Sequence, residues 1–483
     1  MTRLRLIFYL LLAGSVALQS SATAQETLDR TVRPRLGPTP EVRLPKIQKT
    51  ELPNGLKVWL VEAHKVPIVA FNLVMFAGSE CDPLTAPGLA SMTATMIQEG
   101  TSTRTSLQIA DELDAIGAAM NISSQTDFAG ASLNCLTKHM DAALAVFGDV
   151  LTHPTMPEKE FVRVKNDRLT SLLQQKDRAT TIATMAFGKL IYGNSHPYGN
   201  DASGTEQSIK DLTRDDLVRF YQTHYRPNNA TLVVVGDVTM ELMLPRLTKA
   251  FSDWKQADGT VIETFATPSV ETRKLYLVDK PGAPQSEVRI GYPALARSTP
   301  DFFSVNLMNT ILGGQFTSRL NSNIRERRGF SYGVRSMFQF NRLPGPFVAS
   351  GAVQTAKTDS ALQEFLREID LMREKGLTAE ELEYAKNRTK GVFVAGFETP
   401  AQIAGGLVNL VVYKLPDDYF VNYLKNFDAV TLADVQRVAK QYLDSSKMVI
   451  VVVGDVKTIR PGIEHMKFAP VVVTDVAGNP VGN

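Results

Sequence analysis

One segment in the second half of the sequence combines side chains that could stabilise a negatively charged oxygen. Residues 324–335 read Ile-Arg-Glu-Arg-Arg-Gly-Phe-Ser-Tyr-Gly-Val-Arg. The pattern predicts a helix that ends at Gly329, where a left-handed residue is needed, and a strand that starts at Tyr332 with Val334 on the same side. Because the chain reverses at Gly329, the guanidinium of Arg325 and the phenol of Tyr332 can converge. Such a pair could hold a peptide carbonyl or an oxyanion.

The same pattern also fits a purely structural role, with Arg325 as a solvated helix charge and Tyr332 as a half-buried strand aromatic, and the residues alone favour that role. No other segment offers a self-sufficient catalytic site: the sequence lacks a nucleophile elbow, a phosphate loop, a dinucleotide fingerprint and a C-x-x-C pair. No two histidines lie three to five residues apart, so none forms a local metal-binding pair. The six are His64, His139, His153, His196, His224 and His465.

The composition is that of a globular protein with more than one domain. The chain has 483 residues, of which 44% are apolar and 21% are charged. This length is too great for one core, so two or three domains are expected. With 52 Lys and Arg against 50 Asp and Glu, there is no broad basic surface for nucleic acid. We therefore expect no nucleic-acid partner.

The amino-terminal residues have the pattern of a cleavable secretory signal. Within residues 1–24, Arg3 and Arg5 precede an apolar run, and small residues ending in Ala-Thr-Ala predict cleavage before Gln25. The run is shorter than the roughly 20 residues of a spanning helix, so a stable membrane anchor is the less favoured alternative. We expect a periplasmic or secreted protein. In such an oxidising compartment, Cys81 and Cys135 could form one disulfide or remain two thiols.

The sequence contains an internal duplication. Val-Trp-Leu-Val-Glu at 58–62 recurs as Leu-Tyr-Leu-Val-Asp at 275–279, and Val-Val-Val-Gly-Asp-Val at 233–238 recurs at 451–456. The offsets, 217 and 218 residues, differ by only one residue. Such constant spacing indicates a duplicated domain of about 200 residues.

Strand-like runs alternate with helical patterns in both copies without a strict βαβ rhythm. This arrangement favours an α+β fold of two homologous domains, each a mostly antiparallel sheet with helices packed on one face. Capping boxes at Thr105 and Thr378 and a proline at the first position of a helix, Pro87, mark predicted helix starts. The predicted divisions are a signal peptide (1–24), an extended leader (25–45), a first domain (46–255), a linker (256–271), a second domain (272–470) and a tail (471–483).

Several motifs in this order resemble the pitrilysin/insulinase family of zinc metallopeptidases. They are Pro-Gly-Leu-Ala at 87–90, Gly-Thr at 100–101, His-Pro-Tyr-Gly at 196–199, and the repeated Val-Val-Gly-Asp-Val. The resemblance covers residues 46–470 and is greatest to the two-domain branch that includes the mitochondrial processing peptidase and bacterial heterodimeric relatives. It implies two domains that form half of a clamshell around peptide substrates.

The resemblance also implies where a zinc site would lie. Active members carry H-x-x-E-H on the helix after this motif and a glutamate about 76 residues further on. Here the corresponding positions are Ser91, Ala94, Thr95 and a residue near Ser171. Hydroxyl and methyl groups cannot replace imidazole and carboxylate ligands, and Glu99 lies one turn too late. This chain is therefore expected to bind no metal and no other cofactor.

Active relatives also carry an arginine and a tyrosine seven residues apart in the last homologous domain, and Arg325 and Tyr332 have that spacing. The resemblance implies a subunit that supplies this pair in trans, Tyr332 to the oxyanion and Arg325 to the substrate backbone, while a homologous partner with an intact H-x-x-E-H holds zinc. This chain would then be inactive alone. Two alternatives remain open: an inert scaffold or peptide-binding protein of the same fold, and an autonomous enzyme with unrecognised ligands.

Overall fold

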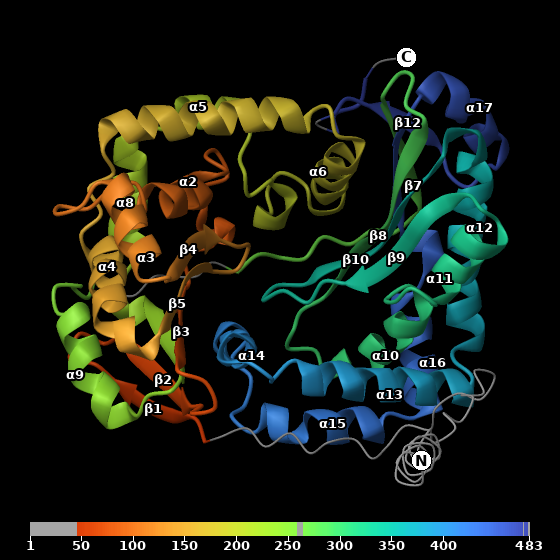
Figure 1. Ribbon diagram of the computed structural model, residues 1–483. Coiled ribbons are helices and arrows are strands. Elements are labelled where there is room, and N and C mark those ends of the chain that lie inside the picture. Colours follow the sequence, from red (N-terminus) through yellow and green to blue (C-terminus); the bar gives the residue numbers. More distant parts are fainter. Residues whose placement is uncertain (1–45, 258–263, 477, 482–483) are drawn as a thin grey trace, which may run out of the picture. The chain divides into compact units, whose positions relative to one another are not determined.

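The computed structural model describes residues 46–257, 264–476 and 478–481 (Figure 1). The predicted signal peptide (1–24) and leader (25–45) lie outside the described residues, as does part of the predicted linker. The described chain contains two six-stranded sheets, each with helices packed against it. The expected α+β fold of two domains, each with a mostly antiparallel sheet, is confirmed.

The first sheet has the strand order β1-β2-β6-β3-β5-β4. Only the pairing of β2 with β6 is parallel. Its strands are β1 (Gln48–Glu51), β2 (Lys57–Glu62), β3 (Ile68–Met75), β4 (Ala119–Ser124), β5 (Ala129–Leu136) and β6 (Ala230–Gly236). Strand β6 is buried along its whole length, as expected for the central apolar run Ala-Thr-Leu-Val-Val-Val-Gly.

The second sheet repeats this topology with the order β12-β7-β11-β8-β10-β9. Its strands are β7 (Lys274–Asp279), β8 (Gln285–Leu295), β9 (Ser331–Phe338), β10 (Gly345–Gln354), β11 (Val449–Gly454) and β12 (Val471–Thr474). The repeated sequences occupy equivalent strands, β2 and β7 for one and β6 and β11 for the other. Strand β12 comes from the segment that we expected to be a tail, and it pairs in parallel with β7.

Helices cover one face of each sheet and close its main core (Figure 1). In the first domain they are α2 (Leu89–Met96), α3 (Ser106–Ala115), α4 (Met140–Thr152), α5 (Glu158–Gln175), α7 (Glu206–Asp211), α8 (Arg214–His224) and α9 (Met240–Ala250). In the second they are α10 (Phe302–Leu312), α11 (Arg319–Asn321), α12 (Thr358–Lys375), α13 (Ala379–Ala395), α15 (Tyr419–Ala429), α16 (Leu432–Tyr442) and α17 (Val456–His465).

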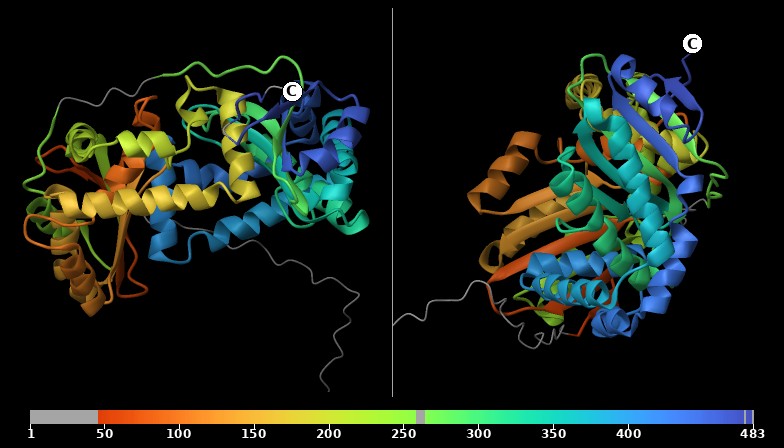
Figure 2. Two further views of the ribbon diagram at one scale, coloured as in Figure 1. Left: turned by 90° about the horizontal axis from the view of Figure 1, so that it is seen from above. Right: turned by 90° about the vertical axis from the view of Figure 1, so that its right-hand side faces the viewer.

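Two further helices are exchanged between the domains. Helix α6 (Ala179–Tyr192) lies between the first-domain helices α5 and α7 in the sequence but packs on β8 and β11 of the second sheet. Helix α14 (Pro400–Val412) comes from the second half of the chain and packs on β3 and β6 of the first sheet (Figures 1 and 2). Each exchanged helix covers the sheet face opposite the main core. Because β3 and β6 are equivalent to β8 and β11, the exchange is reciprocal.

The predicted helix starts are confirmed at two capping boxes and wrong at one proline. Thr105 and Thr378 both form complete capping boxes. The prediction that Pro87 begins a helix is wrong, because Gly88 adopts a left-handed conformation (φ 96°) and helix α2 begins at Leu89. A Cβ at Gly88 would lie 2.8 Å from the backbone of Gly204, so a larger residue does not fit this approach.

Two further sequence expectations concern the cysteines and the membrane. The structure has no disulfide between Cys81 and Cys135, and burial raises the pKa of the Cys135 thiol to about 11. Among the described residues, no helix is both long and apolar enough to cross a membrane.

Candidate functional site

Arg325 lies on a π-helical turn, Ser322–Arg327, that follows α11. The turn ends as the sequence predicts, because Gly329 is left-handed (φ 66°) and its amide donates to the carbonyl of Arg325 (3.1 Å). The guanidinium of Arg325 lies 4.3 Å from the centroid of the Phe316 ring, within range of a cation–π interaction. Its nearest carboxylate oxygen is 3.6 Å away, on Glu326. The aromatic ring and this carboxylate hold Arg325 at the edge of an open pocket.

Tyr332 points into solvent from the start of β9, with 92% of its surface exposed. The alternation of β9 should place Tyr332 on the buried side with Val334, and this expectation is wrong. Val334 pairs with Gly351 but Ser331 pairs with Val353, so β9 has an extra residue at this point. This β-bulge rotates Tyr332 out of the core. The half-buried aromatic of the structural alternative is therefore not what the structure contains.

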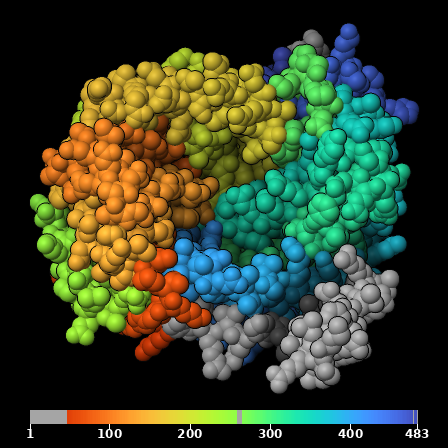
Figure 3. All heavy atoms as spheres, viewed as in Figure 1, coloured from red at the N-terminus to blue at the C-terminus, as the bar shows by residue number. Residues whose placement is uncertain are grey.

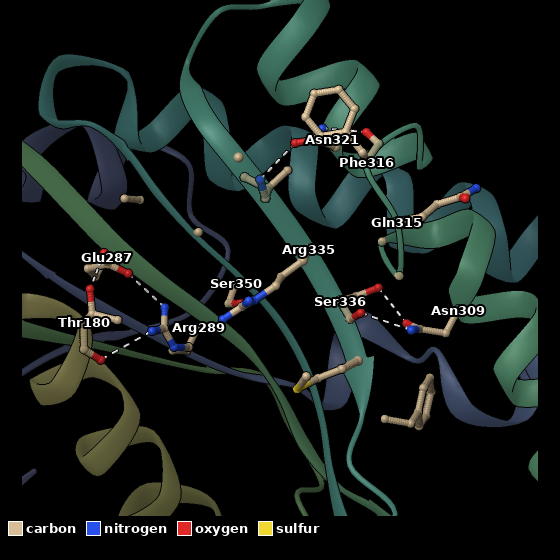
Figure 4. A pocket seen from close by; sticks show the side chains of 18 of the residues that line it. Thr180, Glu287, Arg289, Asn309, Gln315, Phe316, Asn321, Arg335, Ser336 and Ser350 are labelled. Atoms are coloured by element: carbon tan, nitrogen blue, oxygen red, sulfur yellow. Dashed lines mark hydrogen bonds and ion pairs between the residues drawn. The ribbon is translucent and has the colours of Figure 1, made fainter. Parts of the chain in front are cut away.

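The side chains of Arg325 and Tyr332 line the same pocket, which has a volume of about 490 Å³. Tyr332 also borders a second pocket of about 700 Å³, whose walls include Phe316 and the open face of β9 and β10 (Figure 4). In the space-filling view the surface is hollowed beside the teal segment that contains these strands (Figure 3). The structure therefore brings the predicted pair to one accessible place. The catalytic role of the two residues stays a prediction.

Buried polar side chains fix the turn that carries Arg325. Asn323 donates to Glu364 (2.6 Å) and to Glu368 (2.8 Å), both on α12. Asn321 accepts a hydrogen bond from the amide of Val334 (3.1 Å), which links the turn to β9. Such satisfied networks restrict movement, because breaking one leaves a buried polar group unpaired. The turn and the strand are therefore held at a fixed separation.

The positions that the resemblance assigns to zinc ligands also lie together, on α2 and α5. Thr95 and Ser171 line one small pocket of about 230 Å³ with Arg168. The guanidinium of Arg168 donates to Ser91 (3.0 Å) and to the carbonyl of Ser203 (3.0 Å). Burial lowers the pKa of Arg168, and its hydrogen bonds go to a hydroxyl and a carbonyl rather than to a carboxylate. A half-buried cation therefore lies against the positions that the resemblance assigns to zinc ligands.

The residues present at this place do not fit zinc. Catalytic zinc requires three nitrogen, oxygen or sulfur ligands, and the hydroxyls here face a guanidinium that would repel a divalent cation. Glu99 lies at the pocket, but its carboxylate accepts from Arg163 (2.6 Å). Within the part of the chain that the structure describes, no group of three His, Cys, Asp or Glu side chains could hold a metal.

Sequence reasoning missed three features of these sites. Phe316 follows the Gly-Gly pair after α10, and nothing in the sequence pattern indicated that it would contact Arg325. Arg168 could have been found by the helical spacing that places it one turn before Ser171. Arg335 could have been found by the alternation of β9, which places it on the open face of the strand.

Comparison with known proteins shows the family. Residues 57–193 match the model for insulinase (peptidase family M16), and residues 211–389 match that for the peptidase M16 inactive domain. The chain is 25% identical over 357 residues to an uncharacterized zinc protease, YmxG, of Bacillus subtilis, covering 73% of this chain and 85% of the relative. It is 24% identical over 412 residues to a non-peptidase homolog, YmxG, of Helicobacter pylori, covering 84% of this chain and 93% of that relative.

A solved structure agrees with this assignment. A peptidase M16 inactive domain from Pseudomonas fluorescens superposes with a TM-score of 0.79 at 29% sequence identity, covering 84% of this chain and 98% of that one. The chain therefore belongs to the insulinase family, peptidase family M16.

Proposed function

We propose that this chain is the metal-free subunit of a heterodimeric zinc peptidase. A homologous partner with an intact H-x-x-E-H motif would hold the zinc ion and activate the water. This chain would supply Tyr332 to the developing oxyanion and Arg325 to the substrate backbone. Donors held in place before the reaction stabilise charge that develops in the transition state, and this effect is often the largest single contribution to catalysis.

The observation that carries the proposal is the contrast between the two half-sites. At one, hydroxyls and the guanidinium of Arg168 stand at the family's zinc positions. At the other, Arg325 and Tyr332 share a pocket, and a β-bulge exposes the phenol. A protein that only maintained its fold would have no need to expose this tyrosine or to stack an arginine on Phe316 beside it.

The test is peptide hydrolysis by the purified complex of the two subunits. A protein of similar length that carries H-x-x-E-H and is encoded beside this chain is the first partner to try. We expect Tyr332→Phe and Arg325→Ala each to lower kcat/KM by about 10²–10³-fold, because each removes a donor to the transition state. The variants should still form the complex, as measured by size-exclusion chromatography.

A matched substitution controls for loss of charge. Arg460→Ala, on α17, removes an exposed arginine whose ion pair is made within its own helix, with Glu464. It should leave the rate unchanged. If the complex cleaves peptides equally fast with and without Tyr332 and Arg325, the shared catalytic site does not exist.

A second candidate function is an inert scaffold or peptide-binding subunit of the same fold. It is favoured by the match to the inactive-domain model and by the relative named a non-peptidase homolog. A stable complex whose hydrolysis rate equals that of the zinc-binding partner alone would support this function. The autonomous-enzyme alternative predicts one equivalent of tightly bound zinc on the isolated chain, measurable by elemental analysis.

We also propose that the protein acts in the periplasm or outside the cell after removal of residues 1–24. The support is the sequence pattern of those residues. Fractionation of the native host followed by amino-terminal sequencing tests it, and the expected first residue is Gln25. Recovery of the uncut chain from the cytoplasm would contradict this location.

A further inference from the structure

Three polar residues lie side by side across the open face of the second sheet. Ser350 on β10 pairs in register with Arg335 on β9 and with Arg289 on β8. Residues directly opposite each other on neighbouring strands point to the same face, so the three side chains form a line across the sheet. Figure 4 shows the Arg335 side chain extending past Ser350 toward Arg289. We name this set the arginine-serine row.

Two members of the arginine-serine row have hydrogen-bonding capacity that the protein does not use. Ser350 is only 8% exposed, yet its hydroxyl makes no hydrogen bond with any described residue. Arg335 likewise forms no ion pair or hydrogen bond with the described part of the chain, although its side chain reaches the pocket. Arg335 is exposed and Ser350 lines the same pocket, so both groups are open to hydrogen bonds from a ligand.

The third member, Arg289, is fixed in place by its neighbours. It is 7% exposed, its Nη1 donates to Glu287 (3.0 Å) and its Nη2 donates to the carbonyl of Thr180 (3.3 Å) on the exchanged helix α6. The carboxylate of Glu287 also accepts from the hydroxyl of Thr180 (2.8 Å). The pair of Arg289 and Glu287 is therefore neutral and held rigidly, and Arg335 remains as the uncompensated charge of the row.

All three members border two pockets at once. The pocket of about 700 Å³ and a neighbouring one of about 460 Å³ share Arg289, Arg335 and Ser350 in their walls. The other acidic residue at these walls, Asp201, accepts a hydrogen bond from the amide of Ser203 (2.6 Å). Neighbouring strands lie about 4.8 Å apart, so the two arginine backbones are about 10 Å apart with Ser350 between them. This spacing leaves room beside Ser350 for a small anion that the guanidinium of Arg335 approaches.

We propose that the arginine-serine row binds a carboxylate group of the peptide substrate. Arginine forks bind carboxylates through paired charge-assisted hydrogen bonds, and the Ser350 hydroxyl would add a further donor. The inference rests on the proposed function only in taking a peptide as the ligand. The carboxylate can come from an aspartate or glutamate side chain or from the carboxyl terminus of the peptide.

The row lies at a defined place relative to the proposed catalytic pair. Arg335 follows Tyr332 by three residues on β9, and because the bulge adds one residue between them, the separation is about two regular strand steps, roughly 7 Å. An extended peptide running beside β9 with its scissile bond near Tyr332 would therefore place its carboxylate about two residues from that bond. This chain would thus select peptides that carry a carboxylate at this distance and set the position of cleavage within them.

The test measures peptide binding to the isolated subunit by fluorescence anisotropy at low ionic strength. Three labelled 12-residue peptides of Ser, Ala and Val are compared. One has a single central Asp and an amidated carboxyl terminus, one has Asn in its place, and one has Asn and a free carboxyl terminus. We expect a carboxylate to tighten binding about tenfold or more over the neutral peptide, and added salt to reduce this difference.

Two variants assign the difference to the row. Arg335→Gln should abolish the preference for the carboxylate peptide, and Ser350→Ala should reduce it severalfold, while Arg460→Gln should leave it unchanged. The melting temperature of each variant shows whether it is folded. Because Arg335 and Ser350 are substituted separately, the test remains decisive if one of the two variants folds poorly. Preference for the Asp peptide identifies the side chain as the source, and preference for the free terminus identifies the carboxyl end.

Other results would overturn the proposal. They are equal binding of all three peptides by the wild type, or an undiminished preference in Arg335→Gln. The measurement needs neither the partner nor hydrolysis. If the carboxylate preference persists while Tyr332→Phe leaves the rate of the complex unchanged, the proposed function fails and the arginine-serine row stands. If the carboxylate preference is absent while Tyr332→Phe lowers the rate of the complex, the proposal for the arginine-serine row fails and the proposed function stands.

Discussion

Tyr332 and Val334 point to opposite sides of β9, although only one residue separates them. Val334 is in the core of the second domain, whereas Tyr332 is exposed. In a regular strand the two would share a face, and the bulge at Tyr332 and Gly333 removes that constraint. The backbone pairing of β9 with β10 is therefore what exposes the phenol of Tyr332.

Phe316 should affect the rate through Arg325. A cation–π contact contributes roughly 0.5–2 kcal/mol, so Phe316→Ala should lower kcat of the complex by about 2- to 30-fold, with a smaller change in KM. Phe316→Tyr keeps an aromatic face and should retain most of the activity. Steady-state kinetics on the three proteins separate kcat from KM. Equal kcat values for the alanine and tyrosine variants would argue against positioning by the ring.

Arg168 should oppose any attempt to rebuild a zinc site. Installing His, Glu, His and Glu at Ser91, Ala94, Thr95 and Ser171 restores the family's ligand types, but the guanidinium of Arg168 still lies against position 91. We expect this variant to bind zinc at least about tenfold more weakly than the same variant with Arg168→Met, because like charges repel strongly away from water. Isothermal titration with zinc measures both affinities. Equal affinities would mean that Arg168 does not occupy the metal's place.

Glu80 should make stability depend on pH. Its buried carboxyl lies beside Arg342 and Asp127, and burial raises the pKa of Glu80 to about 7, against the opposing effect of Arg342. Between about pH 4.5 and 7 the folded chain keeps this proton and the unfolded chain releases it. The free energy of unfolding should therefore fall as the pH rises through this window, by up to about 1.4 kcal/mol per pH unit from this group.

Urea unfolding at pH 5 and pH 7 measures this dependence. Glu80→Gln should unfold with a smaller difference between the two pH values than the wild type. Glu398→Gln, at an exposed position without such burial, should match the wild type. An unchanged difference in Glu80→Gln would assign the pH dependence to other groups.

The exchanged helix α14 should stabilise the first domain. Leu407 is buried against the first sheet, so Leu407→Ala should cost about 2–5 kcal/mol. Both tryptophans, Trp59 and Trp254, belong to the first half of the sequence and report its unfolding by fluorescence. The midpoint that they report should fall in this variant. Val421→Ala, at an exposed position of α15, should not change it, and an unchanged midpoint for Leu407→Ala would contradict the packing.

Local signals in the sequence were sufficient for most of the fold. The repeated strands, the capping boxes at Thr105 and Thr378, and the left-handed Gly329 each depend on a few neighbouring residues, and all were predicted correctly. The exchange of α6 and α14 was not predictable in this way. An apolar helix face indicates that something covers it, but not which of two similar sheets does so.

The candidate site was predicted in its members but not in its geometry. The spacing of Arg325 and Tyr332 follows from the sequence, whereas the bulge depends on how β10 pairs, which the sequence of β9 does not contain. The missing zinc ligands were visible at Ser91 and its neighbours. The role of Arg168 was not, because its contact with Ser91 joins helices that are 77 residues apart along the chain.

The reciprocal exchange of α6 and α14 suits an origin in two separate polypeptides. Consider two copies of an ancestor with one repeat, in which the helix of each copy packs on the sheet of the other. Such a pair would have formed a symmetric, domain-swapped dimer. Gene fusion could then join the copies without building a new interface, because the swapped helices already bound them. Once joined, the copies could diverge independently, and one could lose metal chemistry while the other kept its arginine and tyrosine.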